Sequence, residues 1–199
     1  AEVNTAVGFL ALKLNTTGHS NASFGAYSMA ANTQSNRNTA LGYNTLSSLN
    51  HTSNIDGYNT VVGFQAGSDI TTGTRNTAVG ALAGDATTTG SYNTFVGFAN
   101  GGANTTGESN VALGDGCFGS NTTGTNNVAI GQAAGDSITT GNNNVILGYQ
   151  AGTYGTNLTT GVGNILVGAY TDTTASGTNY AFGMGYNLDC EGGYTTFGD

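Results

Sequence analysis

Two histidines, two cysteines and eleven carboxylates are the groups that could carry acid–base, nucleophilic or metal chemistry in this chain of 199 residues. A histidine next to a carboxylate could act as a general base, and an activated thiol could act as a nucleophile. His19 follows the corner sequence Thr16-Thr17-Gly18, and His51 lies in a stretch rich in Ser and Asn. Neither has a recurring carboxylate partner, so we interpret both as solvated turn residues.

The carboxylates are scattered along the chain. Only Asp85 and Asp136 share a slot of the repeat described below, three repeats apart. At the spacing of stacked strands this is a separation of about 14 Å. A glycosidase acid and base need roughly 5 to 9.5 Å. No Gly-Gly-x-Gly-x-Asp calcium repeat occurs. We therefore expect no enzyme activity, no metal and no cofactor.

The charge balance argues against two classes of partner. The formal net charge is −8, with Lys13, Arg37 and Arg75 as the basic residues. No cationic stripe exists to neutralise phosphates. No stretch of 18 apolar residues is present either. The sequence thus predicts neither a nucleic-acid partner nor insertion into a membrane.

A five-residue unit, Asn-x-x-x-Gly, recurs along the whole chain. Seven of the eleven gaps between its glycines are 17 residues, and the asparagine is present in eleven of the twelve units, up to Asn179. So short a period indicates a solenoid whose coils bury their apolar faces by stacking. We predict one domain over residues 1–199, an all-β parallel β-solenoid of about twelve 17-residue coils. The glycines are Gly8, Gly25, Gly42, Gly63, Gly80, Gly97, Gly114, Gly131, Gly148, Gly168, Gly183 and Gly198.

Aligned on the glycine, the units predict a strand with two apolar faces. The residue before the glycine is always large and apolar, and we expect this column to form the core, including Val79, Val96, Leu113, Ile130 and Leu147. Two positions earlier stand β-branched residues, Thr in the first half and Val in the second, which favour a strand. The slot between them points the other way and is mostly Ala. A thin coil has one inside, so the alanine face is expected to be covered by a second copy of the chain.

The repeated asparagines and glycines are expected to form structural ladders. Stacked Asn side chains can bond to the equivalent residues above and below, as in cross-β assemblies. The clearest units supply Asn76, Asn93, Asn110, Asn127 and Asn144, followed by Gly80, Gly97, Gly114, Gly131 and Gly148.

Three regions depart from the 17-residue period. Insertions fall near residues 47–56 and 153–158, and the coils in 169–199 are altered. Extra residues in a solenoid bulge outward at turns, where binding surfaces are often built. His51 and Tyr154 are therefore the candidate surface contacts.

The two cysteines are expected to be unpaired within the chain. Cys117 and Cys190 lie about four coils apart. This corresponds to roughly 19 Å along the stack, whereas a disulfide needs Cα atoms within about 7 Å. A disulfide between chains stays open.

The segment Asn126-Asn127-Val128-Ala129-Ile130-Gly131 and its neighbours 109–114 and 143–148 resemble the head repeats of trimeric autotransporter adhesins, the YadA-like group. The Asn-Thr-Ala-Val-Gly units with Thr-Thr-Gly between them are also similar to repeats of phage and viral tail fibres. The resemblance covers nearly the whole chain, although the adhesin repeats are shorter. It implies a left-handed β-roll, a side-by-side homotrimer, an extracellular or virion-surface location, and contact with a host glycan or surface protein.

Two functions follow as hypotheses. The first is a structural and adhesive fibre segment that acts as a rigid spacer and receptor-binding stalk. The alternative is an ice-binding β-solenoid that presents its Thr ladders to a lattice. One threonine column becomes Val111, Val128 and Val145 in the second half. This change suits an interface between chains better than a surface that must present hydroxyl groups.

Overall fold

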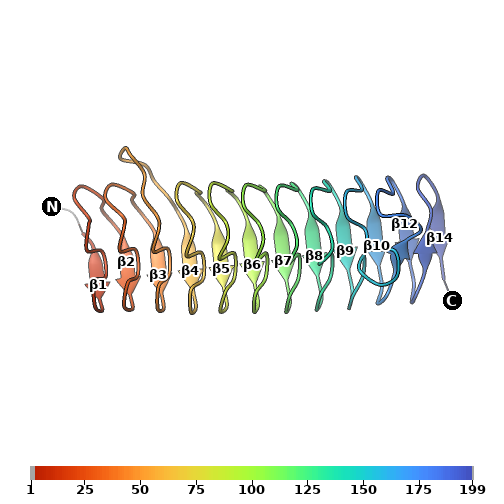
Figure 1. Ribbon diagram of the computed structural model, residues 1–199, viewed down its shortest axis with the longest axis horizontal. Helices are drawn as coiled ribbons and strands as arrows, with labels where there is room; N and C mark the ends of the chain where they lie inside the picture. Colours follow the sequence, from red (N-terminus) through yellow and green to blue (C-terminus); the bar gives the residue numbers. More distant parts are fainter. Residues whose placement is uncertain (1–2, 199) are drawn as a thin grey trace.

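A computed structural model describes residues 3–198 of the protein as one row of short strands along a single long axis (Figure 1). Ten three-residue strands come first, and four further strands occupy the C-terminal coils. They are β1 (Thr5–Val7), β2 (Ala22–Phe24), β3 (Thr39–Leu41), β4 (Thr60–Val62), β5 (Thr77–Val79), β6 (Thr94–Val96), β7 (Val111–Leu113), β8 (Val128–Ile130), β9 (Val145–Leu147), β10 (Ile165–Val167), β11 (Asp172–Thr173), β12 (Phe182–Met184), β13 (Asp189–Cys190) and β14 (Thr195–Phe197).

Twelve of these strands form one parallel sheet in chain order, and β11 pairs with β13 in a second, two-stranded sheet. Every step joins equivalent positions of successive coils, as in Thr77↔Thr94, Ala78↔Phe95 and Val79↔Val96. The predicted parallel β-solenoid is therefore confirmed, with about eleven turns between its first and last strands and no helix in residues 3–198.

The expectation for the core was wrong about which face is inside. The middle residue of each strand, the inner column, is buried in the single chain from β2 to β10: Ser23, Ala40, Val61, Ala78, Phe95, Ala112, Ala129, Ile146 and Leu166. The predicted core residues Val79, Val96, Leu113, Ile130 and Leu147 instead lie half-buried or exposed on the outer face. Alternate residues of a strand point to opposite faces, so once the coil closes around the middle residue, both of its neighbours must face outward.

Size matching between slots explains why the inner column tolerates both Ala and Phe. Phe95 fits because the residues facing it are Gly84 and Gly101, where an added Cβ would come within 2.9 and 2.7 Å of the Phe95 ring. One coil on, the strand slot is Ala112 and the facing side supplies the buried ring of Phe118. Interiors are close-packed, so a large ring on one side of the coil is matched by small residues on the facing side.

The repeated glycines form a backbone ladder in which no side chain fits. A Cβ on Gly114 would lie 2.7 Å from the carbonyl oxygen of Gly131, and its φ is +141°. Gly131 has the same relation to Gly148, at 2.6 Å and φ +128°. Only glycine adopts this backbone conformation freely, which accounts for its presence in every regular coil.

The asparagines four residues earlier form a buried hydrogen-bonded ladder. The amide N–H of Asn110 donates to Oδ1 of Asn93 at 3.0 Å, and its Nδ2 donates to Gly124 O at 2.8 Å. Oδ1 of Asn110 in turn accepts from the amide N–H of Asn127 at 3.1 Å. Asn76 and Asn144 repeat the pattern. Each side chain therefore joins three levels of the stack and leaves no amide group unpaired.

Residues in the left-handed backbone conformation turn the chain at fixed positions of each coil. The residue before the ladder asparagine has φ near +57° in Arg75, Asn126 and Asn143, among others. The side chains of these residues face solvent, because the same bend directs the side chain of the following ladder asparagine inward. At the nearby Thr-Thr-Gly corners, the first threonine is half-buried and its hydroxyl donates to the next level, as from Thr105 to Thr122 O at 3.0 Å.

The predicted alignment of the last coils with the repeat was wrong. Gly183 and Asn179 do not continue the ladders, because Leu166 pairs with Gly183 and thus places this glycine in the inner column. The φ of +156° at Gly185 makes it the ladder glycine of this coil. The thiol of Cys190 occupies the space next to Gly183. A side chain from the facing side of the same coil fills the inner slot here, which local spacing alone does not reveal.

The insertion at residues 47–56 does bulge outward, as expected. In Figure 1 the orange loop between β3 and β4 rises above the row of corners. The backbone of Asn36 and Asp56 pairs at its return, so the following coil resumes the regular stack. Residues 1, 2 and 199 of the predicted domain lie outside the described residues.

Candidate functional site

The outer face of the twelve-stranded sheet is a long apolar surface made of two columns. The residues before the ladder glycines are aliphatic in most coils, and Leu41, Val96 and Ile130 are 50%, 36% and 39% exposed. The other column carries threonine from β3 to β6 and valine from β7 to β9, all exposed or half-buried. Contiguous exposed apolar surface of this kind marks an interaction site.

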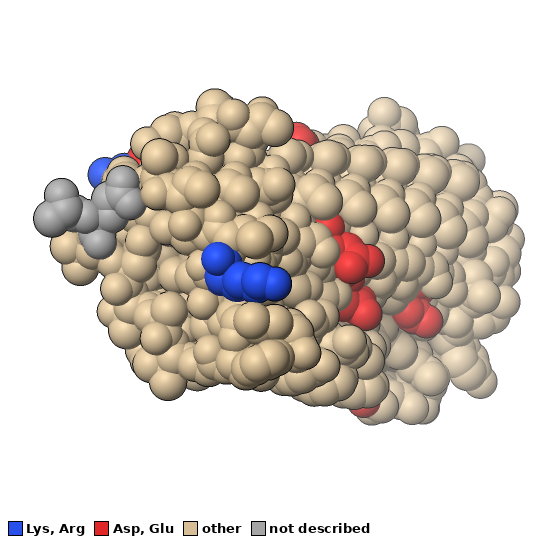
Figure 2. Space-filling view, turned by 60° about the vertical axis from the view of Figure 1, so that its left-hand side comes forward, with Lys and Arg blue, Asp and Glu red and all other residues tan. Residues whose placement is uncertain are grey.

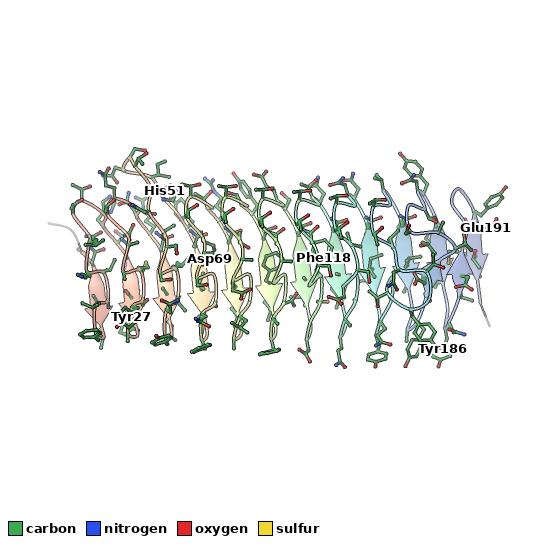
Figure 3. The ribbon with its side chains drawn as sticks, viewed as in Figure 1. Tyr27, His51, Asp69, Phe118, Tyr186 and Glu191 are labelled. Carbon is green, nitrogen blue, oxygen red and sulfur yellow. The ribbon has the colours of Figure 1, made fainter. Side chains whose placement is uncertain are left out.

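One edge of the stack carries a row of aromatic rings after the ladder glycines. Phe9, Tyr27, Tyr43 and Phe64 belong to four successive coils, with neighbouring ring centroids 5.5 to 5.8 Å apart. In Figure 3, Tyr27 lies near one end of this lower edge and Tyr186 near the other. The middle coils interrupt the row, with Ala81, Asp115 and Gln132 at the equivalent position.

Four tyrosines form a second aromatic group on the same edge, which we call the tyrosine cluster: Tyr149, Tyr154, Tyr170 and Tyr186. Tyr170 is central. Its ring centroid lies 5.3 Å from Tyr149, 4.7 Å from Tyr154 and 5.6 Å from Tyr186. Burial and the neighbouring phenols raise the pKa of Tyr170 above its ordinary value. Three rings come from successive coils, and the 153–158 insertion supplies the fourth.

The position before the ladder asparagine has a left-handed backbone and carries Arg and Tyr in alternation over four coils. The members of this Arg–Tyr row are Arg37, Tyr58, Arg75 and Tyr92. The guanidinium of Arg75 lies 5.6 Å from the ring centre of Tyr58 and 5.2 Å from that of Tyr92. Arg37 also covers Tyr58, at 5.7 Å, and forms a salt bridge with Asp56. Exposed cation–π contacts contribute about 0.5 to 1 kcal/mol each. The Arg–Tyr row therefore stabilises the turns near the first insertion.

The two predicted surface contacts have different environments. Tyr154 is 51% exposed and belongs to the tyrosine cluster. His51 was expected to be a solvated residue and candidate contact, and this was wrong, because only 4% of it is exposed. Its Nε2 pairs with the carbonyl oxygen of Thr72 at 3.0 Å, so the ring is held against the next coil. His19 is half-buried, with Nδ1 3.2 Å from the Ser20 hydroxyl.

Both cysteines are unpaired, as expected, and both are buried. The thiol of Cys117 sits among three backbone carbonyls, with Gly131 O nearest at 2.9 Å. Burial raises its pKa to about 11, so the reactive thiolate is scarce at neutral pH. Asn100, one coil earlier in the same slot, donates to the equivalent carbonyls. A structural role as a carbonyl partner therefore accounts for Cys117.

The carboxylates of residues 3–198 are not gathered into a metal cluster. No group of three His, Cys, Asp or Glu side chains is placed to hold a metal ion in this range. Asp136 accepts the amide N–H of Gly119 at 3.0 Å, and Asp172 accepts that of Asn157 at 3.2 Å. Burial raises the pKa of both carboxyls. These acids organise turns of neighbouring coils.

The described residues form extended faces and enclose no pocket. Figure 2 shows a face that is mostly uncharged, with few basic atoms and a group of acidic atoms near its middle. The part of the chain that the structure describes contains no pocket. The arrangement therefore offers extended faces, the apolar sheet and the aromatic edge, to ligands that lie flat on it.

Sequence reasoning missed the two aromatic arrangements. The aromatic residues after the glycines are visible in the repeat, but Tyr27 and Tyr170 stand one position later than Phe9 and Tyr149, so strict alignment separates rings that the structure brings together. The Arg–Tyr row could have been found, since its four members occupy the same slot in consecutive coils.

No helix in the described residues is long and apolar enough to cross a membrane. No protein-family model, curated protein or solved structure matches this chain. The candidate function therefore depends on the geometry of the two faces and on the resemblance of the repeats.

Proposed function

We propose that this chain is a structural and adhesive fibre segment, a rigid rod in which copies associate side by side and hold binding surfaces away from a virion or cell. It has no catalytic role in this proposal. The observation that carries it is the outer face of the sheet, where a continuous apolar column runs the length of a chain whose interior is already filled.

The energetic argument rests on the exposed column. Val96 and Ile130 are more than one-third exposed, and Leu41 is half exposed. Covering apolar surface contributes roughly 25 cal/mol per Å². A second copy presents the same column at the same strand spacing of about 4.8 Å, so two rods can bury a matching row along their whole length.

The number of copies and the hand of the coil come from the resemblance. The head repeats of trimeric adhesins imply three chains and a left-handed β-roll, and the proposal adopts both. Eleven steps between twelve strands give a rod of about 53 Å. The proposal also adopts a location outside the cell or on a virion surface.

Native mass measurement of the purified chain tests the association. We expect a trimer that the double variant Val96→Lys with Ile130→Lys dissociates, because two ammonium groups would be buried in the apolar contact. The circular dichroism spectrum should be unchanged, since both side chains point away from the coil interior. A monomer at micromolar concentration contradicts the proposal.

The control is Thr106→Lys with Thr123→Lys. These exposed corner residues follow β6 and β7 and add the same charge away from the sheet face. We expect this variant to remain associated. Dissociation of both variants would indicate general charge repulsion and would remove the sheet face from the proposal.

Ice binding is the second candidate, favoured by one observation. From β3 to β6 the outer face pairs a threonine column with the aliphatic column, and all four threonines are exposed or half-buried. A regular array of hydroxyl and methyl groups is what a solenoid would need to contact a lattice. Measurement of thermal hysteresis decides: activity from a monomeric chain favours this function, and its absence removes it.

A further inference from the structure

We propose that the tyrosine cluster is a binding platform for a neutral polysaccharide. This inference names a ligand class for the adhesive role proposed above, and it does not depend on self-association. It rests on four rings brought together by three coils and one insertion, on their exposure, and on the absence of basic residues in this half of the chain.

The cluster is not part of the interior. The coil interior here is filled by Ile146, Leu158 and Leu166, which are fully buried. Tyr154 and Tyr186 are 51% and 66% exposed, and Tyr149 is also exposed. Large aromatic residues therefore lie in solvent, at a slot where three middle coils carry Ala81, Asp115 and Gln132 and other coils carry Phe or Tyr.

The insertion gives the cluster its shape. Its peptide N–H at Asn157 is held by the carboxylate of Asp172 at 3.2 Å, and Leu158 returns to the core. Between these anchors and the strand, Tyr154 packs on Tyr170 with a tilt of 59°. A loop fixed at its return thus presents a ring at its exposed part, which favours a preorganised contact.

Local charge selects the class of ligand. All three basic residues lie at or before Arg75, whereas residues 76–199 contain eight Asp or Glu and no Lys or Arg. Nucleic acids, sulfated sugars and anionic lipids would find no counter-charge here. A neutral ligand carries no such penalty.

The shape and chemistry of the cluster favour a sugar polymer. Tyrosine offers an apolar ring that can pack on the C–H face of a pyranose and a hydroxyl that can bond to sugar hydroxyls. With no pocket in residues 3–198 to enclose a small molecule, the ligand must gain its contacts along an extended surface. The ring centroids lie 4.7 to 5.6 Å apart, and the rings of Tyr149 and Tyr186 stand at 89° to that of Tyr170, so one sugar strand can contact ring faces and ring edges in turn.

Affinity electrophoresis of the full chain in native gels tests the proposal. The net charge of −8 carries the protein into the gel, and the gel contains dextran, yeast mannan, galactomannan or hydroxyethylcellulose. We expect at least one neutral polysaccharide to retard the chain. Tyr154→Ala and Tyr186→Ala should each weaken the retardation constant about tenfold, as truncation of a central aromatic contact does.

The matched control is Phe64→Ala, which removes an equally exposed ring, 52% exposed, from the other aromatic block. It should bind as the unaltered chain does. Tyr154→Phe keeps the ring and should lose less than Tyr154→Ala. Thermal melting of each variant identifies any loss of fold. If Tyr154→Ala does not fold, the retardation of Tyr154→Phe tests the proposal instead.

Three results would overturn the proposal: no retardation by any neutral polysaccharide, equal loss in Phe64→Ala, or stronger retardation by heparin or hyaluronate. The native mass reports separately on association. A chain that is trimeric but not retarded refutes only the polysaccharide site, and a retarded monomer refutes only the association.

Discussion

In the middle strands, the small residues of the inner column are buried, whereas the larger residues of the outer column are partly exposed. Inside, Ala112 and Ala129 are fully buried, whereas outside, the larger Leu113 is half-buried and Ile130 is exposed. The interior of so thin a coil is close-packed, and the buried ring of Phe118 already fills the space beside these alanines. The large apolar residues of the outer face are therefore not needed to fill the interior. This is why the outer face is the candidate interface.

The comparison shows that hydrophobicity does not identify the inside of a narrow solenoid. A column of alanines can be the core when the facing slot carries Phe, Ile or Leu, and a column of Val, Leu and Ile can face outward. The packing on each level is set by pairs of slots from opposite sides of the coil.

The adjacent residues Phe95 and Val96 offer the strongest test of this contrast. Phe95→Ala should lower the free energy of unfolding by about 3 to 5 kcal/mol, because Gly84 and Gly101 cannot fill the cavity. Val96→Ala should cost about 1 kcal/mol or less. Denaturant unfolding in dilute solution, where association adds least, measures both. Equal losses would mean that both columns are core.

The asparagine ladder provides a test of intermediate size on the inner side. Asn110→Ala removes the acceptor of the Asn127 amide N–H and the donor to Gly124 O. Leaving such buried groups unpaired should cost about 1 to 3 kcal/mol. Thr123→Ala, on an exposed corner of the next coil, should change stability by less than about 0.5 kcal/mol. A neutral Asn110→Ala in urea unfolding would show that the ladder contributes nothing.

The smallest expected effect concerns pH. Burial raises the pKa of Asp85, Asp136 and Asp172 above the ordinary value of 3.8. The unfolded chain thus ionises first as pH rises, so the stability these groups contribute is present below 3.8 and is lost as pH rises through the folded pKa values. The melting temperature should therefore increase as pH is lowered from about 7 toward 4.

Asp136→Asn sharpens this test, because its side-chain oxygen can still accept the Gly119 N–H. The variant should depend less on pH than the unaltered chain. Glu108→Gln, at an exposed corner, removes the same charge and controls for general repulsion. A melting temperature that falls on acidification to about pH 5 would contradict the assignment.

Most of the fold could be predicted from the sequence, and much of the candidate site could not. The period placed a strand before each ladder glycine up to β10, and it placed the asparagines of the ladder. It failed at Gly183, where a tertiary contact with Cys190 replaces the inner side chain. It also failed at His51, because the burial of this ring depends on its contact with Thr72 of the next coil.

The sequence by itself determined the stacking, since the 17-residue spacing repeats the same strand and turn signals and leaves equivalent residues to pair in register. The glycines follow from the same local rule, because the close approach of successive backbones recurs at one position of each coil. Tertiary structure alone decided which side of the strand faces inward and which rings meet in the tyrosine cluster. Both depend on the direction in which the coil closes and on the volumes of side chains from neighbouring coils, which no single repeat contains.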